Sequence, residues 1–549
     1  MNIKRMVINN FKKFDCISIN FNEGLNIFVG NNEEGKSTLI EAIHLALTGY
    51  YRGQKIASNL SEYIFNANAV NEYLKSVKNA KPIALPLIYI EIWFSGDKKE
   101  LARFNGSANS ECDADGAGIV FEVRFDENYQ NEYELLLADK NNKISSLPIE
   151  YYQIRWRSFA NENITPRMLP FTSVFIDASA IHNNVVVDNF LSRVVRGVLD
   201  TSDVASVTQN YRTAIDNLAD SNVVRQINTK LQACNSFDKT RKILLNANRT
   251  TNFSWLTALT VHLDNTPFVN MGRGMQCVVA THLALTKQKE RTNVVLFEEP
   301  ENHLSYSHLN ELIEQIQRSC CDKQIIITTH SSFVANKLGL NKLILLNNGN
   351  IINFSTIKSY DFFKKSPGYD TLRFLLCKKA IFVEGDSDEL IVQRAYMDLH
   401  DGKLPIYDGI DVISVKTTFL RFLELAEKLN KKVAVVSDND GNYEAVKRKY
   451  EKYMGINAKT NIKICIDSEV DTIDDTVKED DFNMNTLEPK LLKENNLVTF
   501  NEIFGRKFKT TGELLHYMHD NKTDCALAIF DYKGKINYPQ YILDAIQDE

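Results

Sequence analysis

Residues 30–37 read Gly30-Asn31-Asn32-Glu33-Glu34-Gly35-Lys36-Ser37, and this stretch is a strong local signal in the first half of the chain. It matches the pattern GxxxxGK[ST] and lies between a short apolar run and a segment with helical spacing. In that context the glycines let backbone N–H groups surround phosphates, the lysine neutralises their charge, and the hydroxyl ligates Mg²⁺. The residues expected to bind a nucleotide are Gly30, Asn31, Asn32, Gly35, Lys36, Ser37 and Thr38.

Two acidic residues follow another apolar run much later in the chain, at Glu298 and Glu299. A phosphate loop needs a carboxylate at the end of a second strand, so we expect Glu298 to hold the metal ion and Glu299 to act as the general base. His330 ends the next strand-like run, where an imidazole reaches a γ-phosphate. Taken alone, the acids also fit a solvated strand end, and the histidine also fits a structural role.

A fourth element is the stretch Asn270-Met271-Gly272-Arg273-Gly274-Met275-Gln276, which precedes a helical segment. In this order the elements resemble the ABC-type ATPase head of structural-maintenance and recombination proteins. The resemblance implies that ATP is bound, with Gly272, Gly274 and Gln276 of one head covering the nucleotide held by another head. It therefore implies a homodimer or a higher even oligomer.

The chain departs from that family pattern in three places. Asn270 or Met271 stands where the glycine signature usually opens with Ser, and Glu298 replaces the usual Asp. The stretch Asn10-Phe11-Lys12-Lys13 replaces one that usually contains an Arg. Because the signature is degenerate, we expect slow ATP turnover.

Carboxylates also end two apolar runs in the second half of the chain. Glu384 and Asp388 follow one run, and Asp438 and Asp440 follow the other. The carboxyl ends of parallel strands meet at one edge of a sheet, so these acids are expected to converge there. Oxygen-only ligands favour Mg²⁺ or Mn²⁺, which orient an attacking water and stabilise the leaving oxygen of a phosphodiester.

The two acidic motifs together resemble the Toprim domain, the metal site shared by topoisomerases, primases and certain nucleases. Glu488 resembles an additional acid of the nuclease branch, and Lys522 resembles its late lysine, which would stabilise phosphate charge. A surface position is the alternative for both residues. The resemblance implies catalysis by Glu384, Asp388, Asp438, Asp440, Glu488 and Lys522, with the five acids as metal ligands. The acidic run at residues 467–481 is interpreted as a solvated loop.

An ABC-type head with a helical insertion, followed by a Toprim domain, resembles the OLD (overcoming lysogenization defect) nucleases, whose relatives include Gabija-type and retron-associated phage-defence nucleases. The expected fold class is α/β. The ATPase domain is expected at residues 1–182 and 247–365, the helical insertion at 183–246 and the Toprim domain at 366–549. Dimerisation and core packing both stay open for the insertion. The resemblance implies a nucleotide-regulated, Mg²⁺- or Mn²⁺-dependent DNA endonuclease, with a helicase or a retron reverse transcriptase and its nucleic acid as possible partners.

Alternation and apolar runs predict the strands. In the first half they are expected at residues 4–10, 16–21, 25–29, 87–94, 119–125, 133–137, 292–298 and 323–329. In the second half they are expected at residues 379–383, 409–415 and 432–436.

The composition limits the class of protein. A chain of 549 residues predicts two to four domains. A net charge of −6 gives no global basic field, so DNA binding depends on local patches. No apolar run reaches the roughly 18–20 residues of a membrane span, and 9 scattered cysteines favour a reducing cytoplasm. An ATP-gated DNA clamp without nuclease activity and a topoisomerase-like Toprim enzyme are the alternative functions.

Overall fold

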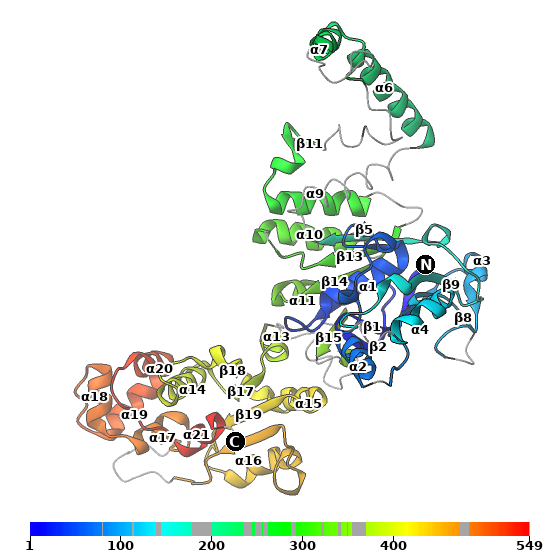
Figure 1. The fold of residues 1–549 in the computed structure, drawn as a ribbon. Helices are drawn as coiled ribbons and strands as arrows, with labels where there is room; N and C mark the ends of the chain where they lie inside the picture. The colour runs from blue at the N-terminus through cyan, green and yellow to red at the C-terminus, as the bar shows by residue number, and fades with distance from the viewer. Residues whose placement is uncertain are drawn as a thin grey trace. The chain divides into compact units, whose positions relative to one another are not determined.

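The computed structural model describes residues 1–79, 81–111, 115–138, 144–177, 200–233, 244–246, 255, 262–286, 292–302, 304–319, 323–338, 342–347, 350–353, 369–471 and 483–547 (Figure 1). The chain forms two compact units. Unit 1 comprises Met1–Leu338 and Lys342–Ile351, and unit 2 comprises Gly339–Asn341 and Ile352–Glu549. The domain boundary expected at residues 365–366 lies outside the described residues, and so do parts of the insertion expected at residues 183–246.

Unit 1 begins with an antiparallel sheet. Its strands are β1 (Asn2–Phe11), β2 (Phe14–Asn20), β6 (Ile88–Ser95), β7 (Asn105–Gly106), β8 (Gly116–Phe125) and β9 (Tyr152–Ser158). They pair in the order β2-β1-β6-β8-β7, and β9 pairs with β8. In β2 the apolar Phe14, Ile17 and Ile19 are buried while the residues between them are exposed, which is the alternation of a strand with one buried face. The strands expected at residues 4–10, 16–21, 87–94 and 119–125 are confirmed.

The strand expected at residues 133–137 is wrong, because helix α4 (Gln130–Ala138) covers that segment. The sequence of α4 consists mostly of good helix formers and contains no Gly, Pro or β-branched residue. Gln130 Nε2 donates to Glu134 Oε1 at 2.7 Å, one turn further along. The alternation of Tyr133, Glu134 and Leu135 imitated a strand over a length too short for periodicity to separate the two structures.

A second sheet in unit 1 contains the strands that flank the phosphate loop. Its order is β10 (Thr172–Asp177), β13 (Thr292–Glu298), β14 (Gln324–Thr329), β3 (Leu25–Val29), β15 (Leu343–Asn347) and β16 (Asn350–Asn353). The strands from β10 to β15 run parallel. Their register pairs Asp177 with Glu298, Glu298 with Thr328 and Val29 with Thr329. The carboxyl ends of four neighbouring strands therefore lie at one edge.

Helices follow the parallel strands and cover the sheet. Helix α1 (Lys36–Thr48) begins after β3 and contacts β10, β13 and β14 (Figure 1). Helix α10 (Tyr306–Ser319) follows β13, α11 (Ser332–Leu338) follows β14, and α9 (Arg273–Thr286) packs on α10. The described part of the insertion contains α6 (Thr201–Ala219) and α7 (Asn222–Ala233), which contact each other. Shorter elements are β4 (Tyr50–Tyr51), β5 (Gln54–Lys55), α2 (Ala67–Lys78), α3 (Lys98–Leu101), β11 (His262–Leu263) and β12 (Thr266–Pro267).

Unit 2 is built on a 4-stranded parallel sheet in the order β18 (Ile410–Ser414), β17 (Lys379–Val383), β19 (Lys432–Ser437) and β20 (Ile462–Ile466). The first three strands and the α/β fold class are as expected from the sequence, whereas β20 was not predicted. The helices are α13 (Tyr369–Leu376), α14 (Asp386–Leu399), α15 (Phe419–Leu429), α16 (Tyr443–Lys449), α17 (Leu487–Glu494), α18 (Leu497–Phe504), α19 (Thr511–Asp520), α20 (Lys522–Asp531) and α21 (Gln540–Ile546). Within the described residues, no helix combines the length and the apolar character needed to cross a membrane.

One buried side chain joins the two sheets of unit 1. Gln324, which opens β14, has 0% exposure. Its Oε1 accepts from Ile3 N at 2.8 Å, and its Nε2 donates to Ile3 O at 2.9 Å and to Asn22 O at 2.8 Å. The amide therefore satisfies both backbone groups of Ile3 in β1 and the carbonyl group of Asn22, which follows β2.

We predict that Gln324→Met destabilises unit 1, because the thioether fills a similar volume but removes the side-chain partner of Ile3 N and of Ile3 O and leaves Asn22 O with only the hydrogen bond from Asn26 Nδ2. The free energy of unfolding measured in urea should fall by about 1–3 kcal/mol. Gln317→Met on α10 is the matched control, because the Gln317 side chain is exposed and donates only to Lys337 O. Equal stabilities of the two variants would contradict the bridging role of Gln324.

Candidate functional sites at the sheet edges

The phosphate loop connects β3 to α1 in a conformation that requires its second glycine. Gly35 has φ 97°, and a Cβ atom there would lie 2.7 Å from Phe14 Cζ, so a larger residue is excluded both by backbone strain and by space. Gly30 is also confined, since a Cβ atom would lie 2.7 Å from Leu346 O. The remaining residues expected to bind nucleotide occupy the loop and the first turn of α1: Asn31, Asn32, Lys36, Ser37 and Thr38.

Lys36 lies inside the loop and is only 6% exposed. Its Nζ donates to Gly30 O at 2.8 Å and to Asn31 O at 3.0 Å. Burial lowers the pKa of Lys36, and the nearby Glu299 and Glu301 oppose that shift. The ammonium is therefore held by carbonyl groups that phosphate oxygens can replace, and the acids after β13 lie within its electrostatic range.

Glu298 and Ser37, the two residues expected to ligate Mg²⁺ beside a nucleotide, are hydrogen-bonded to each other. Burial raises the pKa of Glu298 to about 7, Ser37 opposes the shift, and Asp177 and Glu41 add to it. A carboxyl crowded by other acids gains most from a cation. The structure thus places a hydroxyl and a carboxylate together at the loop, as a nucleotide-bound magnesium requires.

Glu299 and His330 also meet, with His330 Nδ1 3.3 Å from Glu299 Oε1. Glu299 adopts φ 46° and accepts from Asn302 Nδ2 at 2.9 Å, so its carboxylate is fixed by its own loop. Glu301 was missed in the sequence. Its Oε1 accepts from Thr329 Oγ1 at 2.6 Å and from the backbone N–H groups of His330 and Ser331 at 3.1 and 3.2 Å. Glu301 therefore fixes the start of the segment that carries the histidine.

A second missed group lies on α1. Glu41 accepts from Lys12 Nζ and, at 3.1 Å, from Arg52 Nε. Both cations lie over the Tyr51 ring, 5.8 and 5.5 Å from its centroid. Lys12 belongs to residues 10–13, which stand where the family pattern usually has an Arg. Its ammonium group forms an ion pair with the Glu41 carboxylate.

The glycine signature lies at the start of α9, with Gly274 and Gln276 in the first helical turn. Gln276 Nε2 donates to Phe268 O at 2.7 Å, so this side chain holds its own segment. A Cβ atom on Gly272 would meet nothing within 4 Å. The open space around Gly272 is compatible with close approach of another group, which remains the prediction for this stretch.

In unit 2 the expected acids converge at the carboxyl edge of the sheet. Glu384 follows β17, Asp388 lies in the first turn of α14, and Asp438 and Asp440 follow β19, which pairs with β17. Gly385 N donates to Asp388 Oδ2 at 2.9 Å, which turns that carboxylate back toward the strand end. Asp440 adopts φ 50° at the start of the following turn.

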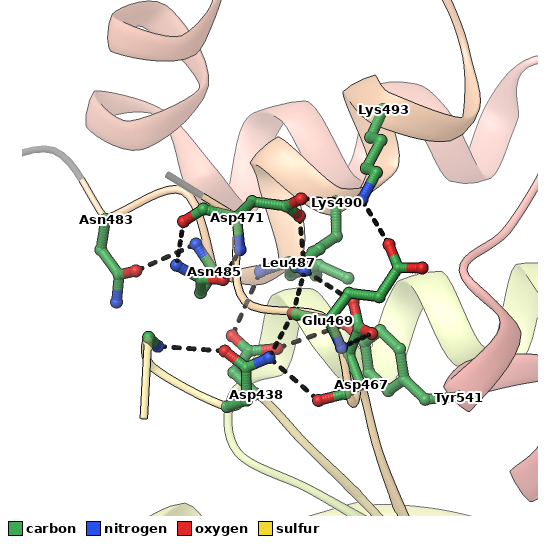
Figure 2. A network of polar contacts seen from close by, with 12 residues as sticks. Asp438, Asp467, Glu469, Asp471, Asn483, Asn485, Leu487, Lys490, Lys493 and Tyr541 are labelled. Atoms are coloured by element: carbon green, nitrogen blue, oxygen red, sulfur yellow. Dashed lines mark hydrogen bonds and ion pairs between the residues drawn. The ribbon is translucent and has the colours of Figure 1, made fainter. Parts of the chain in front are cut away.

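Asp438 is the centre of this group. Its Oδ2 accepts from Leu487 N at 3.1 Å and its Oδ1 from Tyr541 OH at 3.3 Å (Figure 2). The pKa of Asp438 is raised well above its ordinary range by burial and then by Asp388, Glu384, Glu488 and Asp440. The five predicted acids therefore share one electrostatic environment, which we call the acid cluster.

Two further acids of the cluster, Asp388 and Glu384, also have raised pKa values. Burial, with further contributions from Glu488 and Glu384, raises the pKa of Asp388 to about 6, although Gly385 N opposes the shift. Burial and Asp440 raise the pKa of Glu384. Lys522 joins the cluster with its Nζ 3.6 Å from Glu488 Oε1. The late acid and the late lysine therefore reach the same edge from α17 and α20.

The fit of this site to a divalent cation rests on charge and donor type. The acid cluster offers only oxygen donors, which suit Mg²⁺ or Mn²⁺. Across the described part of the chain, no three Asp, Glu, His or Cys side chains form a ready-made metal cage. The crowding that raises the pKa values of Asp438 and Asp388 is nevertheless relieved by a cation.

A polar network beneath the cluster holds its loops (Figure 2). Asn439, with 0% exposure, donates to Asp467 O at 2.9 Å and Glu469 O at 2.7 Å. Lys490 Nζ, from α17, lies 2.7 Å from Asp467 Oδ2 and 2.6 Å from Asp471 Oδ2. The loop expected at residues 467–481 is present at residues 467–471, where Glu469 and Val470 are exposed, but Asp467 and Asp471 are paired with Lys490. Residues 472–481 lie outside the described residues. Lys490 was missed because a lysine in a charged helix gives no local sign of burial.

Comparisons with known proteins match ATPase families to unit 1 and a Toprim family to unit 2. Residues 5–165 match a family described as AAA domain, and residues 140–335 match one described as AAA ATPase domain. Residues 375–440, which contain the first four acids of the cluster, match "Overcoming lysogenization defect protein-like, TOPRIM domain".

Curated relatives share only a short segment. "DNA replication and repair protein RecF" of Lactococcus lactis subsp. cremoris is 42% identical over 53 residues, which is 10% of this chain and 15% of the relative. "DNA repair protein RecN" of Synechocystis sp. is 40% identical over 72 residues, 12% of each chain. The chain thus spans far less than two thirds of these relatives.

Solved structures of similar proteins include Smc heads. The Smc head domain from Pyrococcus furiosus, bound to the C-terminal domain of ScpA, has a TM-score of 0.36 and 13% identity, covering 66% of this chain and 100% of that chain. The Thermotoga maritima SMC head domain has a TM-score of 0.30 and 11% identity, covering 64% and 99%.

We predict that the metal-free protein loses stability as the pH rises from about 4 to about 7. Asp388, with a folded pKa of about 6, and Asp438 bind protons more tightly in the folded state than the ordinary 3.8 allows. The folded state therefore holds more protons in that window, and its advantage disappears as the pH rises through it. In differential scanning calorimetry, Asp438→Asn should reduce this loss and raise the melting temperature near pH 7.

Glu451→Gln is the control, because Glu451 is an exposed carboxylate of the 3₁₀ turn η12 (Glu451–Tyr453). It should leave the pH dependence of melting unchanged. Identical pH dependence in wild type and Asp438→Asn would contradict the crowding of the acid cluster.

Proposed function

Because this chain joins an AAA ATPase domain to a Toprim domain of the overcoming-lysogenization-defect type, we propose that it is an ATP-regulated, divalent-metal-dependent DNA endonuclease. The observation that supports this most directly is the acid cluster, because burial and neighbouring carboxylates raise the pKa values of Glu384, Asp388 and Asp438 at one sheet edge. Sites that perturb several acids in this way are candidates for catalysis. DNA as substrate is supported by the names of two relatives, the DNA replication and repair protein RecF and the DNA repair protein RecN.

The residues of the cluster have two proposed roles. The carboxylates would hold the divalent ion, and they belong to Glu384, Asp388, Asp438, Asp440 and Glu488. Glu384 and Asp440 are exposed, whereas Asp388 and Asp438 are partly buried. When bound, a divalent ion polarises the phosphodiester and offsets its charge. Lys522 stabilises the charge that develops on the phosphate oxygens.

In unit 1 the proposed role is nucleotide binding with slow hydrolysis. The loop residues 30–38 hold the phosphates, Ser37 and Glu298 hold Mg²⁺, and Glu299 with His330 orients the attacking water. Gly272, Gly274 and Gln276 of a second copy would cover the nucleotide, so the active form is a dimer or higher even oligomer. A role in bacterial phage defence, beside a helicase or a reverse transcriptase, completes the proposal and rests on the resemblance to Gabija-type and retron-associated nucleases.

We predict that Lys36→Ala weakens ATP binding by about 100-fold in isothermal titration, because a buried, charge-assisted contact to the phosphates is lost. Lys78→Ala, which removes an exposed lysine from the end of α2, should bind ATP like the wild type. Unchanged ATP affinity of the Lys36 variant would refute the nucleotide site.

We predict that Glu384→Ala and Asp438→Ala each reduce cleavage of supercoiled plasmid by at least about 100-fold with either Mg²⁺ or Mn²⁺. Both variants should still bind DNA, because phosphate contacts come from basic residues. Lys522→Ala should also lose cleavage but retain metal affinity, since an ammonium group is not a ligand. Asp531→Ala, at the exposed end of α20, is the control and should cleave normally.

The product of the wild-type protein separates the alternatives. Nicked or linear DNA supports the endonuclease. Relaxed closed circles would identify a topoisomerase-like enzyme instead. Binding without any change in the DNA, with or without ATP, would favour a nucleotide-gated clamp.

A further inference from the structure

Residues 443–453 contain several basic and aromatic side chains, to which the proposed metal and nucleotide sites assign no role. The segment contains α16 and η12 and reads Tyr443-Glu444-Ala445-Val446-Lys447-Arg448-Lys449-Tyr450-Glu451-Lys452-Tyr453. Lys447 Nζ lies over the Tyr443 ring at 5.8 Å, and Lys452 Nζ lies over the Tyr453 ring at 5.1 Å. In a chain with a net charge of −6, such a segment is a local exception.

Lys449 is the lysine of this segment with two aromatic neighbours. Its Nζ lies 5.4 Å from the Phe419 ring centroid and 5.2 Å from that of Tyr450. Both rings are buried, with exposures of 1% and 0%, and they meet edge to face at 6.2 Å. Rings fixed in this way hold the cation in place without neutralising it.

The position of Phe419 brings Lys449 to the edge that carries the acid cluster. Phe419 begins α15, directly after the short turn η11 (Lys416–Thr418) that follows β18. The carboxyl end of β18 is tied to that of β17, because Ser414 Oγ donates to Glu384 O at 3.2 Å and Val415 N donates to Val383 O at 2.9 Å.

A cation beside the acid cluster reduces the repulsion between the cluster and the phosphates of the DNA. The acid cluster repels phosphates, so DNA reaches it only where cations flank the acids. Lys522 pairs with Glu488 inside the cluster. Lys449 is exposed at the rim and carries its charge toward solvent.

We propose that Lys449, held over Phe419 and Tyr450, binds a phosphate of the DNA backbone next to the acid cluster and so positions the strand for cleavage. This inference rests on the proposed DNA endonuclease function. Because Lys449 contacts phosphate and not bases, it contributes affinity and register but no sequence preference.

The test measures DNA affinity separately from cleavage. A fluorescein-labelled duplex oligonucleotide is titrated with full-length protein in EDTA, and anisotropy gives Kd at several salt concentrations. Lys449→Gln should raise Kd by about three- to tenfold and reduce the slope of log K against log salt by about 1. Lys449→Arg should restore both, because it retains the positive charge.

Lys452→Gln is the matched control. Lys452 is an exposed lysine of the same segment with an aromatic neighbour, but Glu427 neutralises it at 2.7 Å. Its Kd and salt slope should stay within about twofold of the wild type. If the Kd and slope of Lys449→Gln equal those of Lys452→Gln, the phosphate contact is refuted, whether or not the wild type cleaves DNA. If the wild type binds through Lys449 but does not cleave, the endonuclease proposal fails while the phosphate contact stands.

Discussion

Carboxylates held together against their own repulsion are the constraint on which both units depend. Parallel strands end at one edge, so strand pairing brings Asp177 beside Glu298 in unit 1 and the residues after β17 beside Asp438 in unit 2. Burial then raises the pKa of Glu298 to about 7 and that of Asp438 well above its ordinary range. Hydrogen bonding between the strands holds these carboxylates close together, although their mutual repulsion would separate them. A cation that enters either edge relieves the repulsion, and its binding is favoured for that reason.

The acids of unit 2 differ in whether their hydrogen-bond partners are charged or neutral. Lys490, only 3% exposed, forms ion pairs with both Asp467 and Asp471, and these pairs balance the charge of the two carboxylates within the protein. The carboxylate of Asp438 is instead held by one backbone N–H and one phenol, neither of which carries a charge. The charges of Asp467 and Asp471 are thus balanced within the protein, whereas the neutral donors on Asp438 orient its carboxylate and leave its charge for a ligand. The two kinds of acid lie side by side in unit 2, and their partners distinguish them.

The sequence predicts what depends on local pattern. Apolar runs located β3, β13 and β17, and acids placed after such runs reach the sheet edge because strand ends converge. Residues with distant partners could not be predicted: Gln324 bonds Ile3, 321 positions away, and nothing around it in sequence indicates burial. Lys490 escaped notice for the same reason. The error at residues 133–137 has another cause, since three alternating residues fit a strand and a helix equally and only the surrounding helix formers decide.

Net charge and local field lead to different conclusions about this chain. A value of −6 predicts net repulsion from DNA at long range, and the acid cluster adds repulsion where the phosphodiester must lie. Screening limits both effects to about 10 Å at ordinary salt, so only charges near the contact matter. Lysines next to Glu427, such as Lys452 and Lys459, contribute little because their field is cancelled. A lysine held over aromatic rings, and not in an ion pair of the Lys452–Glu427 kind, keeps its charge available to a phosphate. Aromatic rings that hold a lysine beside the acid cluster therefore let an acidic protein place a positive charge there. A phosphate can then contact both the lysine and the cluster.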